Sequence, residues 1–518
     1  MKLLITQPYL WLPVDKKTPE VKLHFTVNGE KFQEVDIQLG EAGAGLYVSM
    51  DVSNYLGQEI EIKSDVEEEK LFHIFCCKES VQHVYPFRPR IHFVPEYGWM
   101  NDPNGLVCEN GVYHLFYQWN PYGVIWGNMH WGHAISRDLI TWEHKPVALT
   151  PDEYGTMFSG CGFQDKDNAS GYGKDALLFF YTSAGGTNQW SADAGNKHVQ
   201  RLAVSLDNCR TLEKKDIVLE HIVGGNRDPK VFYHNGSNAY VMVLYLDGSE
   251  FAIFRSTDLC HWEESQRLSV EGMWECPDLF ELPVENADGE KKWVFWSADG
   301  YYVVGTFDGY QFVPESQRQF AYGTKLPYAA QTYSGVEGRV ISVAWLRTEN
   351  NRGGFRGMMA LPAELSLVKE EENYKVKLQT VKELEQYKKP QAVWNAGEKA
   401  FEIPLCDTAA ELCLNWKPQK TGNAILTVGE VSVSVNFEAG TFTIENRKRY
   451  EEPFVILFDK EKAFQLKLMI DCGMVELFGN DGIIYAAVEV EEMVLKKAIL
   501  VESTVELQAV SFNKIVTA

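Results

Sequence analysis

Residues 99–105 are Trp-Met-Asn-Asp-Pro-Asn-Gly, a cluster of turn-forming residues at the edge of an apolar segment. The segment that follows, Gly-Val-Tyr-His-Leu-Phe-Tyr-Gln at 111–118, has the apolar and aromatic pattern of a strand. Asp102 is therefore expected at the mouth of a strand, where its carboxylate can face a cavity. For an isolated Asp-Pro-Asn-Gly, the simpler interpretation is an Asx turn that bonds its own backbone.

Two later stretches repeat this arrangement and change the interpretation of Asp102. They are Arg-Asp-Pro-Lys-Val-Phe at 227–232 and Glu-Cys-Pro-Asp-Leu-Phe at 275–280. In each, a carboxylate is followed closely by a proline and then by two apolar strands. Three acids, Asp102, Asp228 and Glu275, are thus predicted to occupy the same structural position in successive units.

A second motif shows that these units are repeats. Ser-Arg-Asp-Leu-Ile-Thr-Trp-Glu at 136–143 matches Ser-Thr-Asp-Leu-Cys-His-Trp-Glu at 256–263, and degenerate copies occur at 205–212 and 306–312. The aspartates of the four copies are 69, 51 and 50 residues apart. This period is typical of propeller blades, with each copy at the turn from the third strand to the fourth.

The openings of the repeats number five, which predicts a five-bladed β-propeller. They lie near Asp102, Ser159, Asp228, Glu275 and Gln331. The first strand of each blade lines the central channel of a propeller, so residues at the starts of these strands converge at one end of the axis. The three acids are therefore expected to be neighbours in space.

The segments on either side of the propeller also have strand patterns, so the whole chain is predicted to be all-β. We predict a small N-terminal β domain at 1–85, the propeller at 86–368, a charged linker at 369–398 and a C-terminal β-sandwich at 399–518. The best helix candidate is 370–387, within the linker. A packing role is the simplest one for the N-terminal unit; sugar binding and self-association are the alternatives.

Composition excludes several classes of partner. Lys and Arg total 49 against 72 Asp and Glu, a net charge of -23, which repels nucleic acid and anionic lipid. No apolar run approaches the roughly 18 residues that a membrane span needs. Met-Lys-Leu-Leu-Ile-Thr at 1–6 is interrupted before a signal sequence forms, and the ten cysteines contain no C-x-x-C pair. A cytoplasmic protein with free thiols is expected.

Three carboxylates at a channel mouth are compatible with a metal site or with glycoside hydrolysis. Oxygen-ligated metals usually need an Asp-rich loop, which the sequence lacks. His130 and His133 have a zinc-like spacing for a helix, but they lie on a predicted strand. Glycoside hydrolysis needs one protonated and one ionised carboxyl group. The apolar neighbours of Glu275 favour its protonated form, and the amide donors around Asp102 favour the ionised form.

These blocks closely resemble glycoside hydrolase family 32, which includes levanases, exo-inulinases and invertases. The resemblance rests on the block at 99–105, Phe-Tyr-Gln-Trp-Asn-Pro at 116–121, Trp-Gly-Asn-Met-His-Trp-Gly-His at 126–133, Phe-Ser-Gly at 158–160, Arg-Asp-Pro at 227–229 and Trp-Glu-Cys-Pro-Asp at 274–278. It implies a five-bladed propeller followed by a β-sandwich. The 85-residue leading domain lies outside the family's minimal architecture, so reshaping of the pocket rim and assembly are its candidate roles.

The resemblance further implies a retaining, exo-acting β-fructosidase that hydrolyses terminal fructose from levan- or inulin-type fructans, from their oligosaccharides and from sucrose. Asp102 would be the nucleophile, Glu275 the general acid/base and Asp228 the transition-state stabiliser. No metal or organic cofactor is expected, and a homo-oligomer is possible. The alternatives are a sucrose-preferring invertase, a fructosyltransferase and a non-catalytic fructan-binding propeller. Residues at the family's first-subsite positions are Asn101, Gln118, Trp126, Phe158, Ser159, Arg227 and Trp345.

Overall fold

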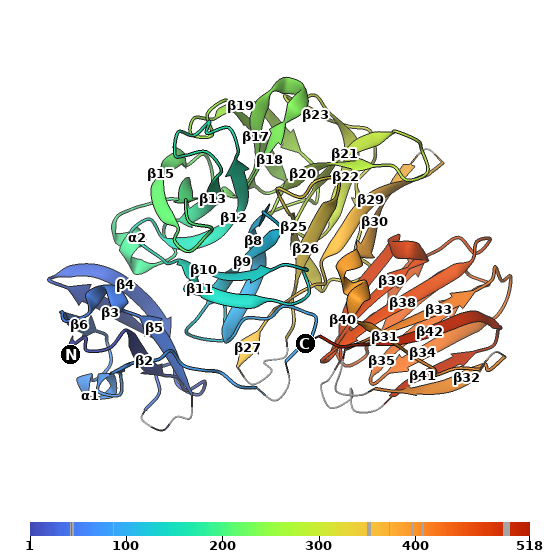
Figure 1. Cartoon of the computed structure of the whole chain (residues 1–518), viewed down its shortest axis with the longest axis horizontal. Helices are drawn as coiled ribbons and strands as arrows, with labels where there is room; N and C mark the ends of the chain where they lie inside the picture. Colours follow the sequence, from blue (N-terminus) through green and yellow to red (C-terminus); the bar gives the residue numbers. More distant parts are fainter. Residues whose placement is uncertain are drawn as a thin grey trace.

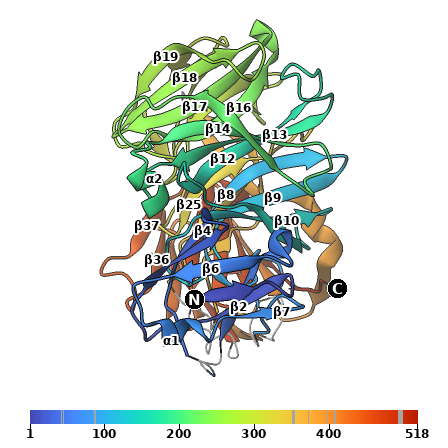
Figure 2. The same cartoon turned by 90° about the vertical axis from the view of Figure 1, so that its left-hand side faces the viewer.

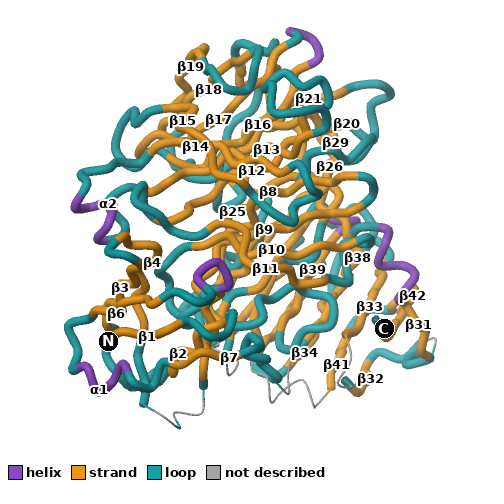
Figure 3. The backbone as a smooth tube through the Cα atoms, turned by 60° about the vertical axis from the view of Figure 1, so that its left-hand side comes forward, coloured by secondary structure: helices purple, strands orange, loops and turns teal. Residues whose placement is uncertain are grey.

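Strands form almost all the regular structure of the described residues, and the helices there are short, with three to six residues each (Figure 3). The computed structural model describes the 518 residues except 42, 44–45, 86–87, 350–353, 372, 396, 406–408, 491–497 and 518. A five-bladed propeller lies between a small N-terminal β domain and a C-terminal β-sandwich (Figure 1). The predicted all-β fold class is confirmed. The predicted boundary at residue 86 lies outside the described residues.

The N-terminal domain consists of two small sheets around one apolar core (Figure 2). Asn28 and Gly29 both have positive φ (51° and 86°), the conformation that a two-residue hairpin turn between β3 and β4 requires. One sheet has the order β1 (Lys2–Leu4), β6 (Glu59–Lys63), β3 (Val21–Val27), β4 (Glu30–Ile37). The other has the order β5 (Tyr47–Asp51), β2 (Tyr9–Pro13), β7 (Phe75–Cys77), and η1 (Ser53–Tyr55) and α1 (Glu68–Leu71) lie in the connections.

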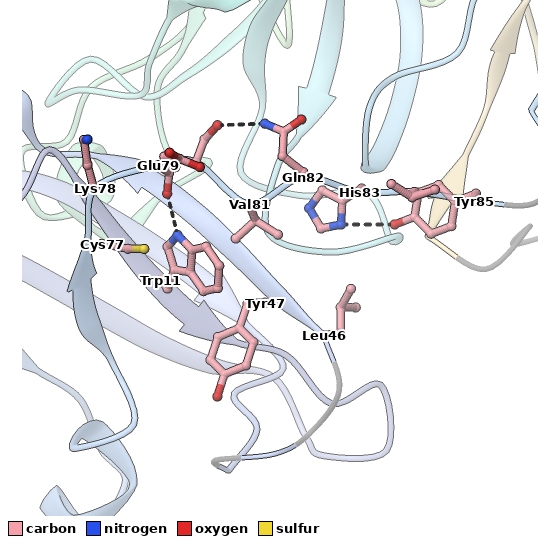
Figure 4. Close-up of a pocket in the computed structure, with 12 residues that line it drawn as sticks. Trp11, Leu46, Tyr47, Cys77, Lys78, Glu79, Val81, Gln82, His83 and Tyr85 are labelled. Atoms are coloured by element: carbon pink, nitrogen blue, oxygen red, sulfur yellow. Dashed lines mark hydrogen bonds between the residues drawn. The ribbon is translucent and has the colours of Figure 1, made fainter.

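The segment that leaves β7 crosses the face of β2 before it enters the propeller. Nε1 of Trp11 donates to the carbonyl oxygen of Glu79 (2.8 Å), and a cavity of about 600 Å³ lies between this segment, Trp11 and Tyr47 (Figure 4). The His83 ring stacks on Tyr97 with centroids 4.6 Å apart. The connection to the propeller is therefore held along the domain by side-chain contacts.

Each blade is an antiparallel sheet whose first strand is innermost. The first three blades are β8 (Gly98–Glu109), β9 (Val112–Asn120), β10 (His130–Ser136) and β11 (Glu143–Leu149); β12 (Thr156–Asp165), β13 (Ala176–Ala184), β14 (Val199–Ser205) and β15 (Glu213–Leu219); and β16 (Arg227–His234), β17 (Ala239–Asp247), β18 (Glu250–Ser256) and β19 (Glu263–Ser269). Two single turns, α2 (Gln189–Asp193) and η2 (Asn235–Ser237), lie in the connections of the second and third blades.

The fourth and fifth blades complete the ring. The fourth is β20 (Asp278–Pro283), β21 (Lys291–Trp296), β22 (Tyr301–Phe307), β23 (Phe312–Pro314) and β24 (Gln319–Phe320), and the fifth is β25 (Pro327–Thr332), β26 (Val340–Leu346), β28 (Met358–Met359), β29 (Ala363–Glu370) and β30 (Asn373–Thr380). The short strand β27 (Phe355–Arg356) pairs in parallel with β8 of the first blade. Backbone hydrogen bonds from Cys108 to Ser334 and from Ser334 to Leu106 (2.9 and 3.0 Å) close the ring.

The repeated Ser-x-Asp motif lies between the third and fourth strands of the blades, where the sequence predicts it. In the first blade, the carboxylate of Asp138 accepts from the hydroxyl of Ser136 (3.0 Å) and from the backbone N–H groups of Ile140 and Thr141 (2.9 and 2.8 Å). Asp258 makes the equivalent bonds in the third blade. In these two blades, the motif is thus a turn that joins the third strand to the fourth.

The C-terminal sandwich consists of two six-stranded sheets. One has the order β31 (Lys388–Gln391), β42 (Leu507–Ile515), β33 (Ala409–Trp416), β38 (Phe464–Asp471), β39 (Met474–Gly479), β40 (Ile484–Glu489). The other has the order β32 (Ala400–Pro404), β41 (Ala498–Ser503), β34 (Asn423–Val428), β35 (Val431–Asn436), β36 (Thr441–Glu445), β37 (Phe454–Leu457).

The predicted linker at 369–398 is wrong for most of its length. β29 and β30 belong to the fifth blade, and β31 belongs to the sandwich, so only η3 (Lys382–Tyr387) and its flanks connect the two domains. Tyr374, Val376 and Leu378 alternate with polar residues and are buried, which is a strand period and not a helix period. The many charged residues between them concealed this alternation in the sequence.

A buried ionic cluster joins the entry segment of the propeller to the sandwich. His92 lies between Asp471 and Glu476, with Nδ1 2.9 Å from an Asp471 oxygen and Nε2 2.7 Å from a Glu476 oxygen. Three backbone N–H groups, of Arg90, Ile91 and His92, also donate to Asp471 (2.9 to 3.1 Å). We call His92, Asp471 and Glu476 the junction cluster.

Candidate active site

Backbone irregularities at the starts of the innermost strands turn side chains toward one end of the ring. The pairing register shifts between Met100 and Pro103 in β8, between Met157 and Gly160 in β12, and between Arg227 and Lys230 in β16. Bulges of this kind re-aim side chains at barrel rims and active sites. Asp228 has φ +64°, and Glu275, just before β20, has φ +53°. Positive φ is strained for such residues and points to a functional constraint.

Asp102 is held by two side-chain donors, one from its own strand β8 and one from β12 of the next blade. The hydroxyl of Ser159 donates to its Oδ2 (2.7 Å), and Nδ2 of Asn101 donates to its Oδ1 (3.1 Å). Asn101 is itself oriented by Nε1 of Trp99, which donates to its Oδ1 (2.9 Å). The first and second blades together therefore fix the orientation of this carboxylate.

Asp228 and Asp102 meet at the thiol of Cys276. The Cys276 sulfur lies 3.4 Å from Oδ2 of Asp228 and 3.7 Å from Oδ2 of Asp102. The backbone N–H of Cys276 also donates to Asp228 (2.9 Å), and the N–H of Asp228 donates to the hydroxyl of Thr182 (3.1 Å). Residues from the first, third and fourth blades are thus brought together, as the repeat pattern predicts.

Glu275 has polar partners on both oxygens. Arg227 donates to Oε1 (2.5 Å), and the hydroxyl of Tyr328 donates to Oε2. Apolar surroundings are expected for Glu275 from its neighbours in the sequence, but its carboxylate has these two polar partners. The neighbouring Trp274 donates from its indole to the Tyr328 hydroxyl (2.9 Å). The Glu275 side chain is 30% exposed and that of Asp228 only 7%, so Glu275 is the acid more open to solvent.

Burial shifts the titration of both aspartates. It raises the pKa of Asp228 to about 7, against the opposing effect of Arg227 and together with repulsion from Asp102 and Glu275. Burial also raises the pKa of Asp102, although the bonds from Ser159 and Asn101 lower it. The donors around Asp102 therefore favour its ionised form, as expected, but burial outweighs them in the net shift of the pKa. Asn104, one of the expected donors, contacts Ser159 rather than Asp102.

The predicted binding residues lie around the acids. With the Asn104 amide oriented to satisfy both of its polar atoms, it accepts from Nε2 of Gln118 (3.0 Å) and donates to the Ser159 hydroxyl (3.2 Å). Gln118 is therefore connected to Asp102 through Asn104 and Ser159. This chain of contacts runs from the buried amide of Gln118 to the carboxylate of Asp102.

Aromatic side chains form the outer part of the site. Trp126 is 52% exposed, and its ring makes an edge contact with Phe158 (centroids 6.0 Å apart). On the other side, Trp345 makes edge contacts with Trp99 (5.7 Å) and Tyr328 (6.3 Å). All ten predicted site residues thus belong to one contiguous set, and their individual roles stay predictions.

The zinc alternative finds no support at His130 and His133. Nδ1 of His130 contacts the carbonyl oxygen of Asn128, whereas Nε2 of His133 contacts Nδ1 of His114 (3.1 Å). The two histidines have separate partners. Among the described residues, no group of three or more His, Cys, Asp or Glu side chains is arranged to hold a metal ion. No helix in the described ranges is long and apolar enough to cross a membrane.

Sequence reasoning missed two residues that contact the acids directly, Cys276 and Tyr328. Cys276 follows Glu275 and was considered only as an apolar neighbour. Tyr328 lies in β25, three residues before Gln331, at the fifth blade opening. That opening carries no acid to mark it as part of the site. The position of Tyr328 at a blade opening was the feature of the sequence from which its place in the site could have been predicted.

Comparisons with known proteins agree with this geometry. The model of the glycosyl hydrolases family 32 N-terminal domain matches residues 92–379, from the junction cluster to the last strand of the fifth blade. Levanase of Bacillus subtilis (strain 168) is 35% identical over 453 residues, which are 76% of this chain and 65% of that protein. Extracellular exo-inulinase of Aspergillus niger is 32% identical over 349 residues, 56% of this chain and 65% of that protein.

The structural comparison extends over more of the chain. The crystal structure of exo-inulinase from Aspergillus awamori has a TM-score of 0.74 at 25% identity and covers 84% of this chain and 100% of that chain. This chain spans slightly less than two thirds of the length of the curated relatives above. Because the family model matches more than half of the sequence, the chain belongs to glycosyl hydrolases family 32.

Proposed function

We propose that the protein is a retaining, exo-acting β-fructosidase that releases terminal fructose from fructans, fructo-oligosaccharides and sucrose. The observation that carries the proposal is the convergence of Asp102, Asp228 and Glu275 from three blades. Cys276 lies within 3.7 Å of both aspartates, and Arg227 bonds Glu275 (2.5 Å) and lies 3.9 Å from Asp228. The relatives named levanase and exo-inulinase support fructans as the substrate class.

The surroundings of each acid support a different proposed role. Asp102 is the nucleophile, because Ser159 and Asn101 fix its carboxylate and no Lys, Arg or His among the described residues forms an ion pair with it. Its attack on the anomeric carbon forms a fructosyl-enzyme ester and breaks the bond to the leaving group. Glu275 protonates the leaving oxygen and then removes a proton from the water that hydrolyses the ester. Its partial exposure allows this exchange of protons.

Asp228 is suited to hold hydroxyl groups of the sugar ring. Its carboxylate contacts the backbone N–H and thiol of Cys276 and retains capacity to accept further hydrogen bonds. Such bonds strengthen as positive charge develops on the ring in the transition state. A retaining mechanism places the carboxyl groups of Asp102 and Glu275 about 5–5.5 Å apart, against roughly 6.5–9.5 Å for inversion.

A substrate panel tests the proposal. Purified protein is incubated with sucrose, 1-kestose, inulin and levan, and initial rates and product sizes are measured. Fructose is the expected first product from each substrate that is cleaved. Oligosaccharides of intermediate size as first products would contradict exo action, and chain-lengthened products at high sucrose would identify a fructosyltransferase. Binding of these sugars without turnover would identify a non-catalytic propeller.

A matched pair of variants links turnover to the site. Glu275→Gln is compared with Glu59→Gln, whose side chain is exposed on the N-terminal domain and forms a surface salt bridge with Lys2. The first should abolish turnover and the second should retain it. Equal activity in both variants would place the chemistry elsewhere in the protein.

A further inference from the structure

The N-terminal domain contacts the propeller beside the aromatic pair Trp126 and Phe158. Its edge strand β4 faces α2 and β10, which lie in the second and first blades (Figure 1). Trp126 lies in the connection from β9 to β10, and Phe158 lies in β12. The two members of the aromatic pair therefore belong to different blades, and β4 reaches both blades.

The β9–β10 connection is anchored in the N-terminal domain on both sides of Trp126. Before it, Tyr122 and Val124 are 4% and 6% exposed and belong to the apolar core of that domain. After it, the Asn128 amide makes two bonds with the backbone of Asp36: it accepts from the N–H (2.8 Å) and donates to the carbonyl oxygen (2.7 Å). The open edge of β4 is thus paired by a side chain of the propeller.

The neighbouring contacts of β4 strengthen this anchor. Nε2 of Gln33 lies 3.4 Å from Nε2 of His130, which starts β10. Within the connection, the Asn120 side chain donates to the carbonyl of Ile125 (2.9 Å) and accepts from Asn128 (3.1 Å). Trp126 therefore projects from a short loop that contacts the N-terminal domain on both sides of this residue.

The same strand also fixes the blade that carries Phe158. Glu34 is 4% exposed, and its Oε1 accepts from the backbone N–H of Gln189 at the start of α2 (2.8 Å). Two residues earlier, the hydroxyl of Thr187 bonds the hydroxyl of Thr156 (2.7 Å) and its backbone N–H (3.2 Å). Thr156 begins β12, so this path ends two residues before Phe158.

We propose that the N-terminal β domain is part of the substrate-binding site. Through Gln33, Glu34 and the backbone of Asp36, it sets the position of Trp126 relative to Phe158 and so governs the affinity for the fructoside. The inference rests on the proposed function for its substrate class. Gln33, Glu34 and Asn128 are positioning residues, because they act through the aromatic pair and do not touch the acids.

Two variants remove the contacts separately. Asn128→Gly deletes both bonds to Asp36 and tolerates the φ of +46° at this position, so backbone strain does not confound the result. Glu34→Ala deletes the bond to Gln189 together with the ion pairs to Lys22 and Lys31, whereas Glu34→Gln loses the charge of the ion pairs but keeps an oxygen acceptor for Gln189. Lys2→Ala is the matched control, because β1 is the opposite edge of the same sheet and Lys2 makes an exposed salt bridge.

Steady-state kinetics with 1-kestose and sucrose give the first readout. Asn128→Gly and Glu34→Ala should each raise KM about tenfold, equivalent to about 1.4 kcal/mol of binding, with kcat changed less than about twofold. Glu34→Gln and Lys2→Ala should keep the KM of the wild type. An unchanged KM in both Asn128→Gly and Glu34→Ala, or a fall in kcat alone, would overturn the inference.

Hydrogen exchange separates failure of this inference from failure of the proposed function. Amides at 121–130 and 187–196 should exchange faster in Asn128→Gly and Glu34→Ala, respectively, and at the wild-type rate in Lys2→Ala. If the wild type cleaves no fructoside, the proposed function fails, and calorimetric binding of 1-kestose to the same variants replaces KM. Unaltered exchange in both segments would overturn the inference whatever the activity.

Discussion

Two groups of acids, the active-site acids and the junction cluster, show what burial does to a carboxylate when its hydrogen bonding differs. Asp471 accepts hydrogen bonds from three backbone N–H groups and from His92, and these bonds lower its pKa despite complete burial. Asp228 is equally enclosed but has the Cys276 N–H as its only backbone donor among the described residues. Its pKa rises to about 7.

The difference separates acids that stabilise the fold from acids that remain available to a ligand. In the junction cluster, the donors supplied by the protein balance the desolvation of the charge. In the active site, the carboxylate of Asp228 can accept further hydrogen bonds. Two further acids repel its charge, and its pKa is raised. A sugar with several hydroxyl groups supplies the kind of donor that these carboxylates lack.

The largest expected effect concerns turnover. Asp102→Asn and Glu275→Gln should each lower kcat by about 10⁴-fold, because each removes a group that forms or breaks a bond. Sugar binding and thermal stability should be largely kept. The measurement is kcat on sucrose and 1-kestose, with Glu476→Gln as the counterpart from the junction cluster. Wild-type turnover in either active-site variant would remove that residue from its role.

The next effect concerns stability. His92→Ala should lower the free energy of unfolding by about 3–5 kcal/mol, because it leaves two buried carboxylates without their shared partner. Burial opposes protonation of His92, but Asp471 and Glu476 prevail and raise its pKa from 6.5 to about 9. Its stabilising contribution is therefore complete below pH 6.5 and is lost as the pH rises through about 9.

Denaturant unfolding between pH 6 and pH 10 measures this contribution. The wild type should lose stability across that range, and His92→Ala should show a much smaller slope. The destabilisation caused by the substitution should accordingly shrink as the pH approaches 10. A penalty that is the same at pH 6 and pH 10 would show that His92 is not charged in the junction cluster.

Asp228 and Asp471 have pKa values shifted in opposite directions, so replacing each by asparagine should change the melting temperature in opposite directions. The raised pKa of Asp228 means that its charged form destabilises the fold, increasingly as the pH rises from about 4 to about 7. Asp228→Asn should therefore raise the melting temperature at pH 8 and have little effect at pH 4. The lowered pKa of Asp471 means that its charged form stabilises the fold at pH values above the usual pKa of an aspartate. Asp471→Asn should therefore lower the melting temperature at pH 8. Shifts of the same sign would contradict the comparison.

The sequence predicts the propeller better than it predicts the domain junctions. The Asp-containing turns and the carboxylate–proline openings repeat, so blade number and the convergence of Asp102, Asp228 and Glu275 follow from position alone. The linker prediction at 369–398 failed because charges mask a short strand whose buried positions alternate. A local pattern cannot show that Lys377 is paired with Glu285 and Asp481 from distant segments.

The same limit applies to the electrostatics of the site. Neighbours in the sequence suggested apolar surroundings for Glu275, but its partners are Arg227, 48 residues away, and Tyr328, 53 residues away. The pKa of Asp102 depends on the balance of burial against hydrogen bonds, and burial is set by the packing of residues that are distant in the sequence. Residue identity and repeat position therefore predict which groups meet, and only the packed structure gives their charge state.

The smallest effect comes from a matched pair of tyrosines. Tyr328 donates to Glu275 in the active site, and Tyr485 donates to Glu476 in the junction cluster (2.7 Å). Tyr485→Phe should lower the free energy of unfolding by about 1.5–3 kcal/mol, because a buried carboxylate loses a donor that water cannot replace. Its kcat should match that of the wild type.

Tyr328→Phe should lower kcat and leave the stability of the protein unchanged. Water can reach the partly exposed Glu275 and replace the lost donor, so the melting temperature should stay unchanged, whereas kcat should fall about tenfold because the proton donor is less well oriented. The measurements are the melting temperature and the kcat on sucrose of both variants. If Tyr328→Phe destabilised the protein as much as Tyr485→Phe, the active-site acids would belong to the same structural class as the junction cluster. The number of hydrogen bonds that the protein supplies to a buried carboxylate would then not distinguish acids that stabilise the fold from acids that bind a ligand.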